Sequence, residues 1–581
     1  MSTITLSPDA KSDVTAKDLH DIASKFNIKI SPEDKDAYLL LLQSADAIYN
    51  TVSEYPEKIP AVLKPVKTVQ PRTFSRPIQD ENPLNAWSHK CHLEAANPTS
   101  GLLAGRTVAI KDNISVGGLP TTLGVLPAQV SKTGEYVSSD IDAVVVSRLL
   151  QAGAVIKGTA VCEAYSAAPT SFTSATGIVS NPWAKERGYT AGGSSSGCGA
   201  LIGLKAMAEK GVLTETDFMG QPSVELAVGG DQGGSIRLPA SYNGIYGLKA
   251  THGLIPYTGA MGISPMIDHL GPMATKLDDI ALMLQVMAGD DALDTRMTPD
   301  TPKADQVKDY SGILRTFRES LQNPSTTATS QPRPLRIGLL LESFAAPGLS
   351  TQVRDTVLDA ARQAFIHAGA VVKEISIPMH HRGPLIWTAA TRKTMGDFAI
   401  SGETQGYLTW SVSHMNLKWP PDQSMYDQLS ATNPTIMNLI FCAAYLKEKF
   451  GPSADAAGHR AVFSLRAAYD AVLESSGEDG VDILVTPTVP TVSFKCPYLD
   501  TKDDQPTSVM ERVKAAVGHS YNTCPFNVTG HPAMSVPCGF GDSEGRKEKV
   551  PIGMQLVGRR WEDETVLKAA ALLERGLELS R

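Results

Sequence analysis

Positive charge is not in excess in this 581-residue sequence: 53 lysines and arginines stand against 61 aspartates and glutamates, a net charge of −8. That balance gives no electrostatic case for binding nucleic acid or an anionic membrane surface. The seven cysteines are an odd number with no Cys-x-x-Cys pair, so neither a disulfide framework nor a zinc site is indicated. No apolar run is long enough to span a bilayer, and no signal peptide opens the chain. We therefore expect a cytoplasmic protein.

Hydrophobic patterning divides the chain into two regions. Residues 1–75 are predicted to form a helical N-terminal extension, because the apolar residues of 36–49 share one helical face. From about residue 100, short β-branched runs alternate with helical patterns, which favours a sheet covered by helices on both faces. The clearest predicted strands are 106–111, 154–157, 335–341 and 482–486, and the clearest predicted helices are 139–150 and 277–288.

Two segments are rich in glycine and serine, 192–199 and 229–239. Glycine has a backbone-entropy cost, so clusters of it need a reason, although tight loops between strands and helices would explain either segment alone. In 231–235, two glycines precede a serine hydroxyl, and backbone N–H groups there can approach a substrate carbonyl oxygen closely. That arrangement is typical of an oxyanion hole, in which one donor lowers the barrier by roughly 3 kcal/mol.

A serine needs a neighbouring base to become a nucleophile. Residues 193–197 formally match the G-x-S-x-G elbow of histidine-dependent hydrolases, but the preceding segment 182–189 lacks the strand pattern that the elbow requires. Lysine is the other candidate, since Lys111 ends an apolar run. Burial there would lower its pKa and leave free amine near neutrality. Spacing alone leaves open a solvated lysine at a strand edge.

Together these segments resemble the three core motifs of the amidase signature family, in the family's order: 106–113, 192–195 and 230–239. The likeness runs from about residue 80 to the C-terminus, and it is most similar to stand-alone amidases, including those linked to nitrile metabolism. Several distant motifs in order are a stronger signal than any one glycine loop. The other matching segments are 247–251, 268–272, 486–488, 527–533, 535–539 and 551–558.

The resemblance implies a serine hydrolase that cleaves amide bonds by a Ser–Ser–Lys relay. By position, Ser235 is the nucleophile, Ser194 is the bridging serine that follows a cis peptide bond, and neutral Lys111 is the terminal base. An acyl-enzyme intermediate and its hydrolysis by water are then expected. The implied oxyanion hole consists of the backbone N–H groups of Gln232, Gly233, Gly234 and Ser235.

The resemblance also assigns supporting roles. Ser195 is similar to a hydroxyl that hydrogen-bonds near the lysine, and Asp231 with Arg237 corresponds to a pair that fixes the nucleophile loop. An ordinary structural ion pair explains that pair equally well. Two features depart from the family pattern: Ser196 stands where glycine is common, and 205–220 is interpreted as an insertion that forms a surface excursion.

Other candidate residues are interpreted as structural or left open. Four isolated histidines lack the spacing of metal ligands, and Cys198 is interpreted as a packing residue. The substrate pocket is expected to draw on the region 380–460, because an acyl pocket is usually apolar; core packing would explain each aromatic there equally. The histidines are His252, His269, His519 and His531, and the aromatics are Trp387, Tyr407, Trp410 and Trp419.

The family resemblance implies an α/β/α sandwich with a mixed central sheet at 76–581, with a smaller lobe inserted at about 290–480. It implies no metal and no organic cofactor, a small-molecule amide or carbamate as substrate, and allows a homodimer. Carbamate or ester hydrolysis by the same triad stays open, as do an amidase subunit of a tRNA-dependent amidotransferase complex and an inactive scaffold. A Glu-Lys-Cys site of the nitrilase type, using Cys162, Glu163 and Lys111, would leave the glycine–serine loops unexplained.

Overall fold

The chain contains two compact units, residues 1–61 and 62–581. In the first, helix α1 (Ala16–Lys25) begins where the Thr15 N–H donates to the Asp18 carboxylate at 2.7 Å. Helix α2 (Lys35–Ser53) contains the predicted helix 36–49, which is confirmed. The computed structural model describes residues 12–212, 224–322, 333–404, 406–477, 480–497, 508–543 and 548–580.

A mixed, 12-stranded sheet crosses the described part of the second unit, in the order β1-β2-β4-β3-β5-β7-β6-β11-β12-β10-β8-β9. Strand β3 pairs in parallel with β4 and β5, and β8 pairs in parallel with β9 and β10. The predicted α/β class with a mixed sheet is confirmed. The strands are β1 (Phe74–Ser75), β2 (Trp87–Leu93), β3 (Thr107–Lys111), β4 (Val155–Ala160), β5 (Leu226–Gly230), β6 (Tyr246–Lys249), β7 (Leu270–Ala274), β8 (Arg336–Leu340), β9 (Val371–Ile375), β10 (Ile483–Pro487), β11 (Ala533–Asp542) and β12 (Lys549–Gly558).

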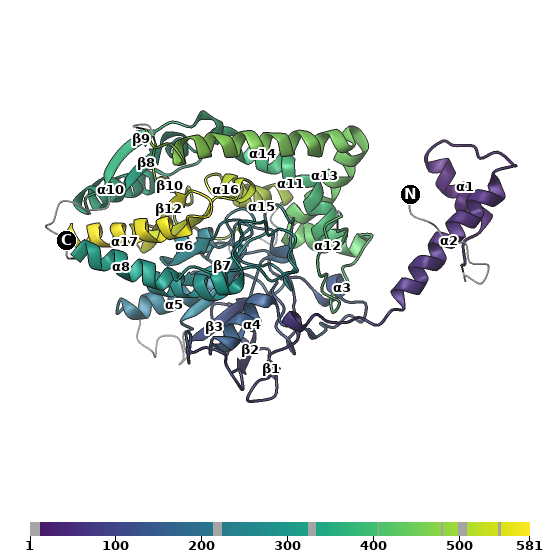
Figure 1. Cartoon of the computed structure of the whole chain (residues 1–581), viewed down its shortest axis with the longest axis horizontal. Coiled ribbons are helices and arrows are strands. Elements are labelled where there is room, and N and C mark those ends of the chain that lie inside the picture. The colour runs from purple at the N-terminus through teal and green to yellow at the C-terminus, as the bar shows by residue number, and fades with distance from the viewer. Residues whose placement is uncertain are drawn as a thin grey trace. The chain divides into compact units, whose positions relative to one another are not determined.

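Helices cover both faces of this sheet. Ile483 and Val485 of β10 belong to the core that includes α10 and α17, and α17 lies between α10 and α8 (Figure 1). Leu484 faces the other way, onto Leu465 and Tyr469 of α14, as the two-residue period of a strand requires. The helices are α3 (Pro127–Val130), α4 (Val144–Gln151), α5 (Ser196–Glu209), α6 (Arg237–Asn243), α7 (Leu277–Met287), α8 (Tyr310–Gln322), α9 (Leu341–Phe344), α10 (Thr351–His367), α11 (Gly383–Met395), α12 (Gln423–Thr432), α13 (Pro434–Phe450), α14 (Pro452–Leu473), α15 (Val509–Ala516), α16 (Pro525–Thr529) and α17 (Asp563–Leu579).

The predicted strands correspond to β3, β4, β8 and β10, and the predicted helix 277–288 corresponds to α7. The prediction of a helix from residue 139 is wrong at its start, because α4 begins only at Val144. The reason is Asp142, whose carboxylate binds the Arg72 guanidinium at 2.7 Å and the Gly117 N–H at 2.7 Å. Of the predicted insertion 205–220, residues 205–209 continue α5, while 213–220 lie outside the described residues.

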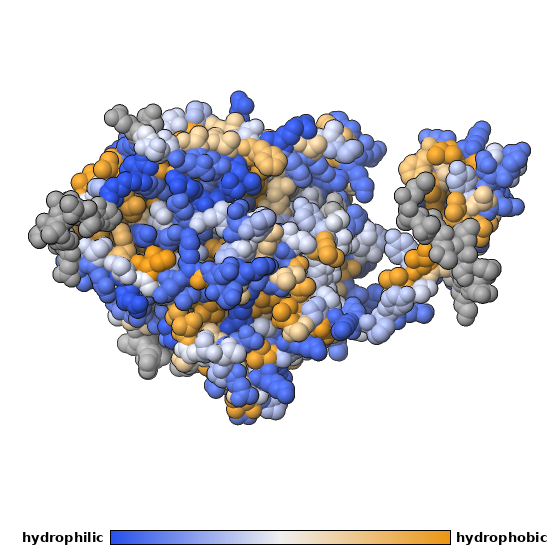
Figure 2. Space-filling view, in the orientation of Figure 1, coloured by the Kyte–Doolittle hydropathy of each residue, from blue (hydrophilic) through white to orange (hydrophobic). Residues whose placement is uncertain are grey.

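Hydrophilic side chains predominate on the visible face of the larger unit, interrupted by small apolar patches (Figure 2). None of the helices in the described ranges combines the length and apolar character needed to cross a membrane.

Candidate active site

Lys111 lies at the end of β3, and its side chain is fully buried. Both edges of β3 are paired with other strands, so the alternative of a solvated edge lysine does not apply. Its Nζ donates to Ser194 Oγ at 2.7 Å and to the Gly230 carbonyl at 3.3 Å. Burial lowers the pKa of Lys111 below the ordinary value for lysine, because a low-dielectric surrounding disfavours the charged form.

The glycine–serine loop places two buried hydroxyl groups beside this amine. The Gly193–Ser194 peptide bond is cis. Ser195 Oγ donates to the Gly230 carbonyl at 3.1 Å and accepts from the Gly230 N–H at 3.2 Å. Lys111 and Ser195 therefore share one carbonyl acceptor, and the loop is fixed against the end of β5.

Asp231 and Arg237 form a fully buried ion pair at the two ends of the next loop. Arg237 Nε and Nη2 each lie 2.9 Å from a carboxylate oxygen of Asp231, and Asn527 Nδ2 donates to the same carboxylate at 2.8 Å. Burial alone would raise the pKa of Asp231, but the charge and hydrogen bonds of Arg237, with those of Asn527, hold it well below its usual range. The pair is charged, its polar groups are hydrogen-bonded, and it can fix the shape of the loop.

Side chains from distant segments donate hydrogen bonds to the carbonyl groups of the loop between Asp231 and Arg237. Trp387 Nε1 donates to the Gln232 carbonyl at 3.0 Å, and Thr523 Oγ1 donates to the Gly233 carbonyl at 2.6 Å. In a planar trans peptide the following N–H points the opposite way from the carbonyl. The direction of the loop N–H groups is therefore set by contacts from distant segments.

These N–H groups are not equivalent, which corrects one prediction. The Gly234 N–H donates to Asp231 Oδ1 at 2.7 Å, so it is not free to bind an oxyanion. The N–H groups of Gln232, Gly233 and Ser235 donate no hydrogen bond to any described residue. Only those three stay candidates for the oxyanion hole.

Ser235 borders a cavity of about 430 Å³. Its hydroxyl makes no hydrogen bond within the described part of the chain, while its carbonyl accepts the Ser195 N–H at 3.2 Å. Of the four aromatic candidates from sequence, only Trp387 lines this cavity among the described residues. Sequence reasoning missed the segments 166–169 and 516–521, which carry no chemical motif of their own and reach the cavity only through the tertiary fold.

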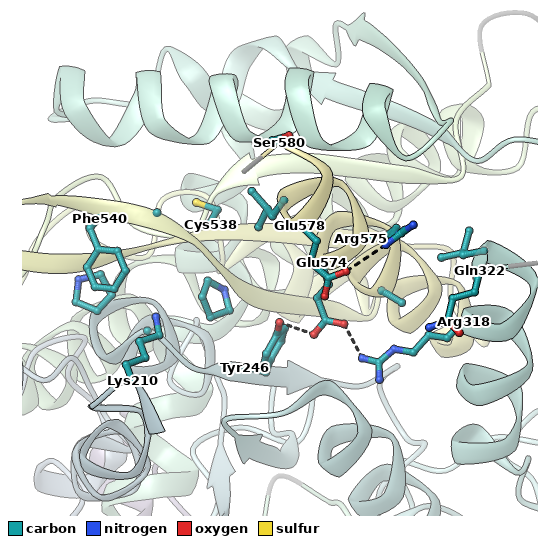
Figure 3. A pocket seen from close by; sticks show the side chains of 17 residues that line it. Lys210, Tyr246, Arg318, Gln322, Cys538, Phe540, Glu574, Arg575, Glu578 and Ser580 are labelled. Carbon is teal, nitrogen blue, oxygen red and sulfur yellow. Dashed lines mark hydrogen bonds and ion pairs between the residues drawn. The ribbon is translucent and has the colours of Figure 1, made fainter. Parts of the chain in front are cut away.

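A larger hollow of about 760 Å³ lies elsewhere, between α8, α17, β11 and β12. Figure 3 shows Glu574 between Tyr246 and Arg318: Glu574 accepts from Tyr246 at 2.7 Å and pairs with Arg318 at 2.5 Å. None of the predicted catalytic residues lines it. The smaller cavity at Ser235 is therefore the candidate site for the chemistry.

The alternative Cys162–Glu163 site is not arranged for nucleophilic attack. Burial raises the pKa of the Cys162 thiol far above its ordinary value, so the reactive thiolate is disfavoured. The Glu163 carboxylate accepts hydrogen bonds from Thr173 Oγ1 at 2.6 Å and from Ser196 Oγ at 2.8 Å. Ser196, which departs from the family pattern, thus has a hydrogen-bonding role.

The residues interpreted as structural are held by protein groups. His269 Nδ1 lies 2.8 Å from the Ile267 carbonyl, and His531 Nε2 lies 2.9 Å from Asp470. Cys198 is fully buried. Across the described ranges, no group of three or more His, Cys, Asp or Glu side chains could hold a metal ion.

Replacing Arg237 with methionine should destabilise the fold by about 3–5 kcal/mol, because it leaves the Asp231 charge buried without its partner. Equilibrium urea unfolding measures this loss. Since the folded-state pKa of Asp231 is lowered, the stabilisation by the pair is present at neutral pH and is lost as the pH falls through that lowered pKa.

Arg362→Ala is the matched control for this prediction. Arg362 pairs with Glu374 at 2.9 Å with both side chains about half exposed (50% and 55%), so its removal should change the unfolding free energy by less than about 1 kcal/mol. If Arg237→Met and Arg362→Ala lose equal amounts of unfolding free energy, the buried Asp231–Arg237 pair is not what stabilises the loop.

Comparison with known proteins agrees with this geometry. The family model described as Amidase matches residues 59–567. An enantioselective amidase from Rhodococcus rhodochrous is 34% identical over 505 residues, covering 86% of this chain and 85% of the relative. One subunit of the glutamyl-tRNA(Gln) amidotransferase of Methanosarcina mazei is 30% identical over 485 residues, covering 82% of this chain and 86% of that subunit.

Solved structures share the fold. A 6-aminohexanoate cyclic dimer hydrolase in complex with substrate has a TM-score of 0.61 at 22% identity, covering 83% of this chain and 87% of that one. A bacterial aryl acylamidase has a TM-score of 0.59 at 21% identity, covering 82% and 83%.

Proposed function

Because this chain belongs to the Amidase family and is an amide-cleaving enzyme, we propose that Ser235, Ser194 and Lys111 form its catalytic relay and that small carboxamides are its substrates. The observation that carries the proposal is the 2.7 Å hydrogen bond from Lys111 Nζ to Ser194 Oγ. When Lys111 is neutral its amine carries a lone pair, so across the same 2.7 Å contact the Ser194 hydroxyl can donate its proton to Nζ.

The first half of the reaction forms an acyl-enzyme. Neutral Lys111 takes the proton of Ser194 while Ser194 takes the proton of Ser235, and the Ser235 oxygen bonds to the amide carbon. The carbonyl electron pair moves onto oxygen, where the free N–H groups of the loop stabilise it. The proton returns from Lys111 through Ser194 to the leaving nitrogen, the carbon–nitrogen bond breaks, and ammonia or an amine departs.

The second half repeats the relay with water. Water loses a proton along the same path and attacks the acyl carbon of the Ser235 ester. The ester bond breaks, a carboxylic acid is released, and the Ser235 hydroxyl is restored. The same acyl chemistry would serve a carbamate or an ester, so the leaving group must be identified by comparing substrates.

The cavity favours a small, mainly apolar acyl group. Its walls include Leu238, Ile263, Met395 and Leu439, and its volume of about 430 Å³ is within the range of small-molecule sites. We therefore place the acyl chain of the substrate in this cavity, with the amide carbonyl at Ser235.

The isolated chain should hydrolyse acetamide or a simple anilide without any partner protein. This result separates a stand-alone amidase from one component of an amidotransferase complex, a role that relatives at about the 30% level carry. Release of ammonia or aniline by the purified protein measures it. Turnover that appears only with a second protein present would contradict the stand-alone proposal.

Replacing Gly234 with alanine should reduce amide hydrolysis by about 100-fold or more, because the loop can no longer present its donors. Gly234 has φ +138°, and a Cβ there would lie 2.1 Å from Leu238 Cδ1 and 2.4 Å from Thr523 Oγ1. Gly369→Ala is the control: φ is +87°, but nothing lies within 4 Å of its Cβ. Steady-state kinetics on folded protein should show the loss only for Gly234→Ala.

A further inference from the structure

Arg392 is the single charged side chain among the described residues that line the Ser235 cavity. It lies near the end of α11, and its guanidinium has neither an ion pair nor a hydrogen bond with any described residue. Burial lowers the pKa of Arg392, and no carboxylate of the described residues is among the groups that shift it. A partly buried cation is unfavourable without a counter-charge, so this one needs a partner that the described residues do not supply.

Two other cationic side chains of the larger unit show the contrast. Lys393, the next residue of α11, pairs with Asp455 at 3.0 Å and with Asp397 at 3.4 Å. Arg296, also buried, pairs with Asp294 at 2.7 Å. Arg392 differs from them both in lining the cavity and in having no carboxylate partner within the described ranges.

The rest of the cavity adds to its positive character. Thr435, the second residue of α13, lines the same cavity, so the N-terminal end of that helix faces it. A helix N-terminus carries partial positive charge and favours anions. Neither aspartate nor glutamate occurs among the described lining residues, and the other walls are mainly apolar.

We infer that Arg392 binds a carboxylate on the acyl part of the substrate, at a distance from the amide that is cleaved. The inference rests on the proposed function, because it places the scissile carbonyl at Ser235. The apolar walls then hold the chain that joins the two groups, and the planar guanidinium binds the carboxylate in a bidentate manner. The preferred substrates are monoamides of dicarboxylic acids, and Arg392 is the residue that selects them.

The test compares pairs of primary amides of equal chain length, one ending in a carboxylate and the other in a methyl group. Wild-type enzyme should show the higher kcat/KM for the charged member at the length that reaches Arg392. In Arg392→Met the ratio of charged to neutral kcat/KM should fall by about 10- to 100-fold, the range for losing a charge-assisted hydrogen bond. Arg392→Lys should keep part of the preference, since it retains a point charge.

Arg382→Met is the matched control, because it removes one positive charge from the exposed turn before α11 and should leave the ratio unchanged. A second measurement does not need turnover: the dicarboxylate product should raise the melting temperature of the wild type more than the monocarboxylate of equal length. Arg392→Met should abolish that difference.

Equal kcat/KM values for the two amides at every length, or a ratio and a melting shift unaffected by Arg392→Met, would overturn the inference. Hydrolysis of the neutral amides, with fluorophosphonate labelling of Ser235, would show in that case that the proposed function stands. Loss of labelling and of all hydrolysis would count against the proposed function, and the melting shift would still decide the role of Arg392.

Discussion

Ser235→Ala should lower kcat for amide hydrolysis by about 10⁴-fold or more, the scale on which loss of a nucleophile acts in serine hydrolases. The variant should also lose covalent labelling by a fluorophosphonate, which reacts with an activated serine. The physical reason is that its hydroxyl borders the cavity beside the unpaired N–H groups of the loop and makes no hydrogen bond to any described residue, so it is free to attack a bound carbonyl. Mass spectrometry of the labelled peptide and steady-state kinetics measure the two effects.

Ser147→Ala provides a matched control for that prediction. Ser147 is buried on α4, and its hydroxyl likewise has no hydrogen-bond partner in the described residues. Its replacement should leave labelling and kcat unchanged. If another serine is labelled in Ser235→Ala and the variant keeps its activity, that other serine is the nucleophile.

Lys111→Met should lower kcat/KM by about 10³-fold and remove its pH dependence, because the amine must be unprotonated to act as a base. In the wild type, kcat/KM should rise with pH as Lys111 loses its proton, and should level off above its pKa. Burial lowers that pKa, so the plateau should begin below the ordinary range for lysine. A pH–rate profile at subsaturating substrate measures both features.

Two other buried groups could titrate in the same pH range, and each gives a control. Burial lowers the pKa of Lys249 to about 7 and raises that of Glu163 to about 7. Lys249 Nζ bonds to the His531 carbonyl at 2.5 Å and to no serine among the described residues. Folded Lys249→Met and Glu163→Gln should therefore keep the rise of kcat/KM with pH. If the rise of kcat/KM with pH disappears in one of these two variants but persists in Lys111→Met, the residue replaced in that variant is the base.

Local sequence was sufficient for the parts of the site that lie on one continuous segment. The apolar run 106–111 predicts a buried strand, and β3 puts Lys111 at its end. The glycines of 229–235 predict a tight turn, which follows β5. Such features depend on residues close together in the chain, where periodicity and turn chemistry act directly.

What local pattern could not supply is the set of contacts made across the fold. The Gly234 N–H is engaged by a carboxylate three residues away, and only the folded loop shows that it is unavailable. Trp387 reaches the Gln232 carbonyl across 155 residues of sequence. Nothing in the local sequence distinguishes Arg392 from other helical residues, and only the tertiary structure places it at the cavity.

Arg237 joins the nucleophile loop to the end of the chain. Its guanidinium donates to Asn527 on α16 at 2.7 Å, to Gln555 on β12 at 2.7 Å and to the Thr523 carbonyl at 3.0 Å. During synthesis Ser235, the proposed nucleophile, therefore leaves the ribosome long before the groups that hold its loop in place. A nascent chain that ends before β12 would carry all three residues of the proposed relay and still be inactive, so we expect activity to appear only when translation is nearly complete.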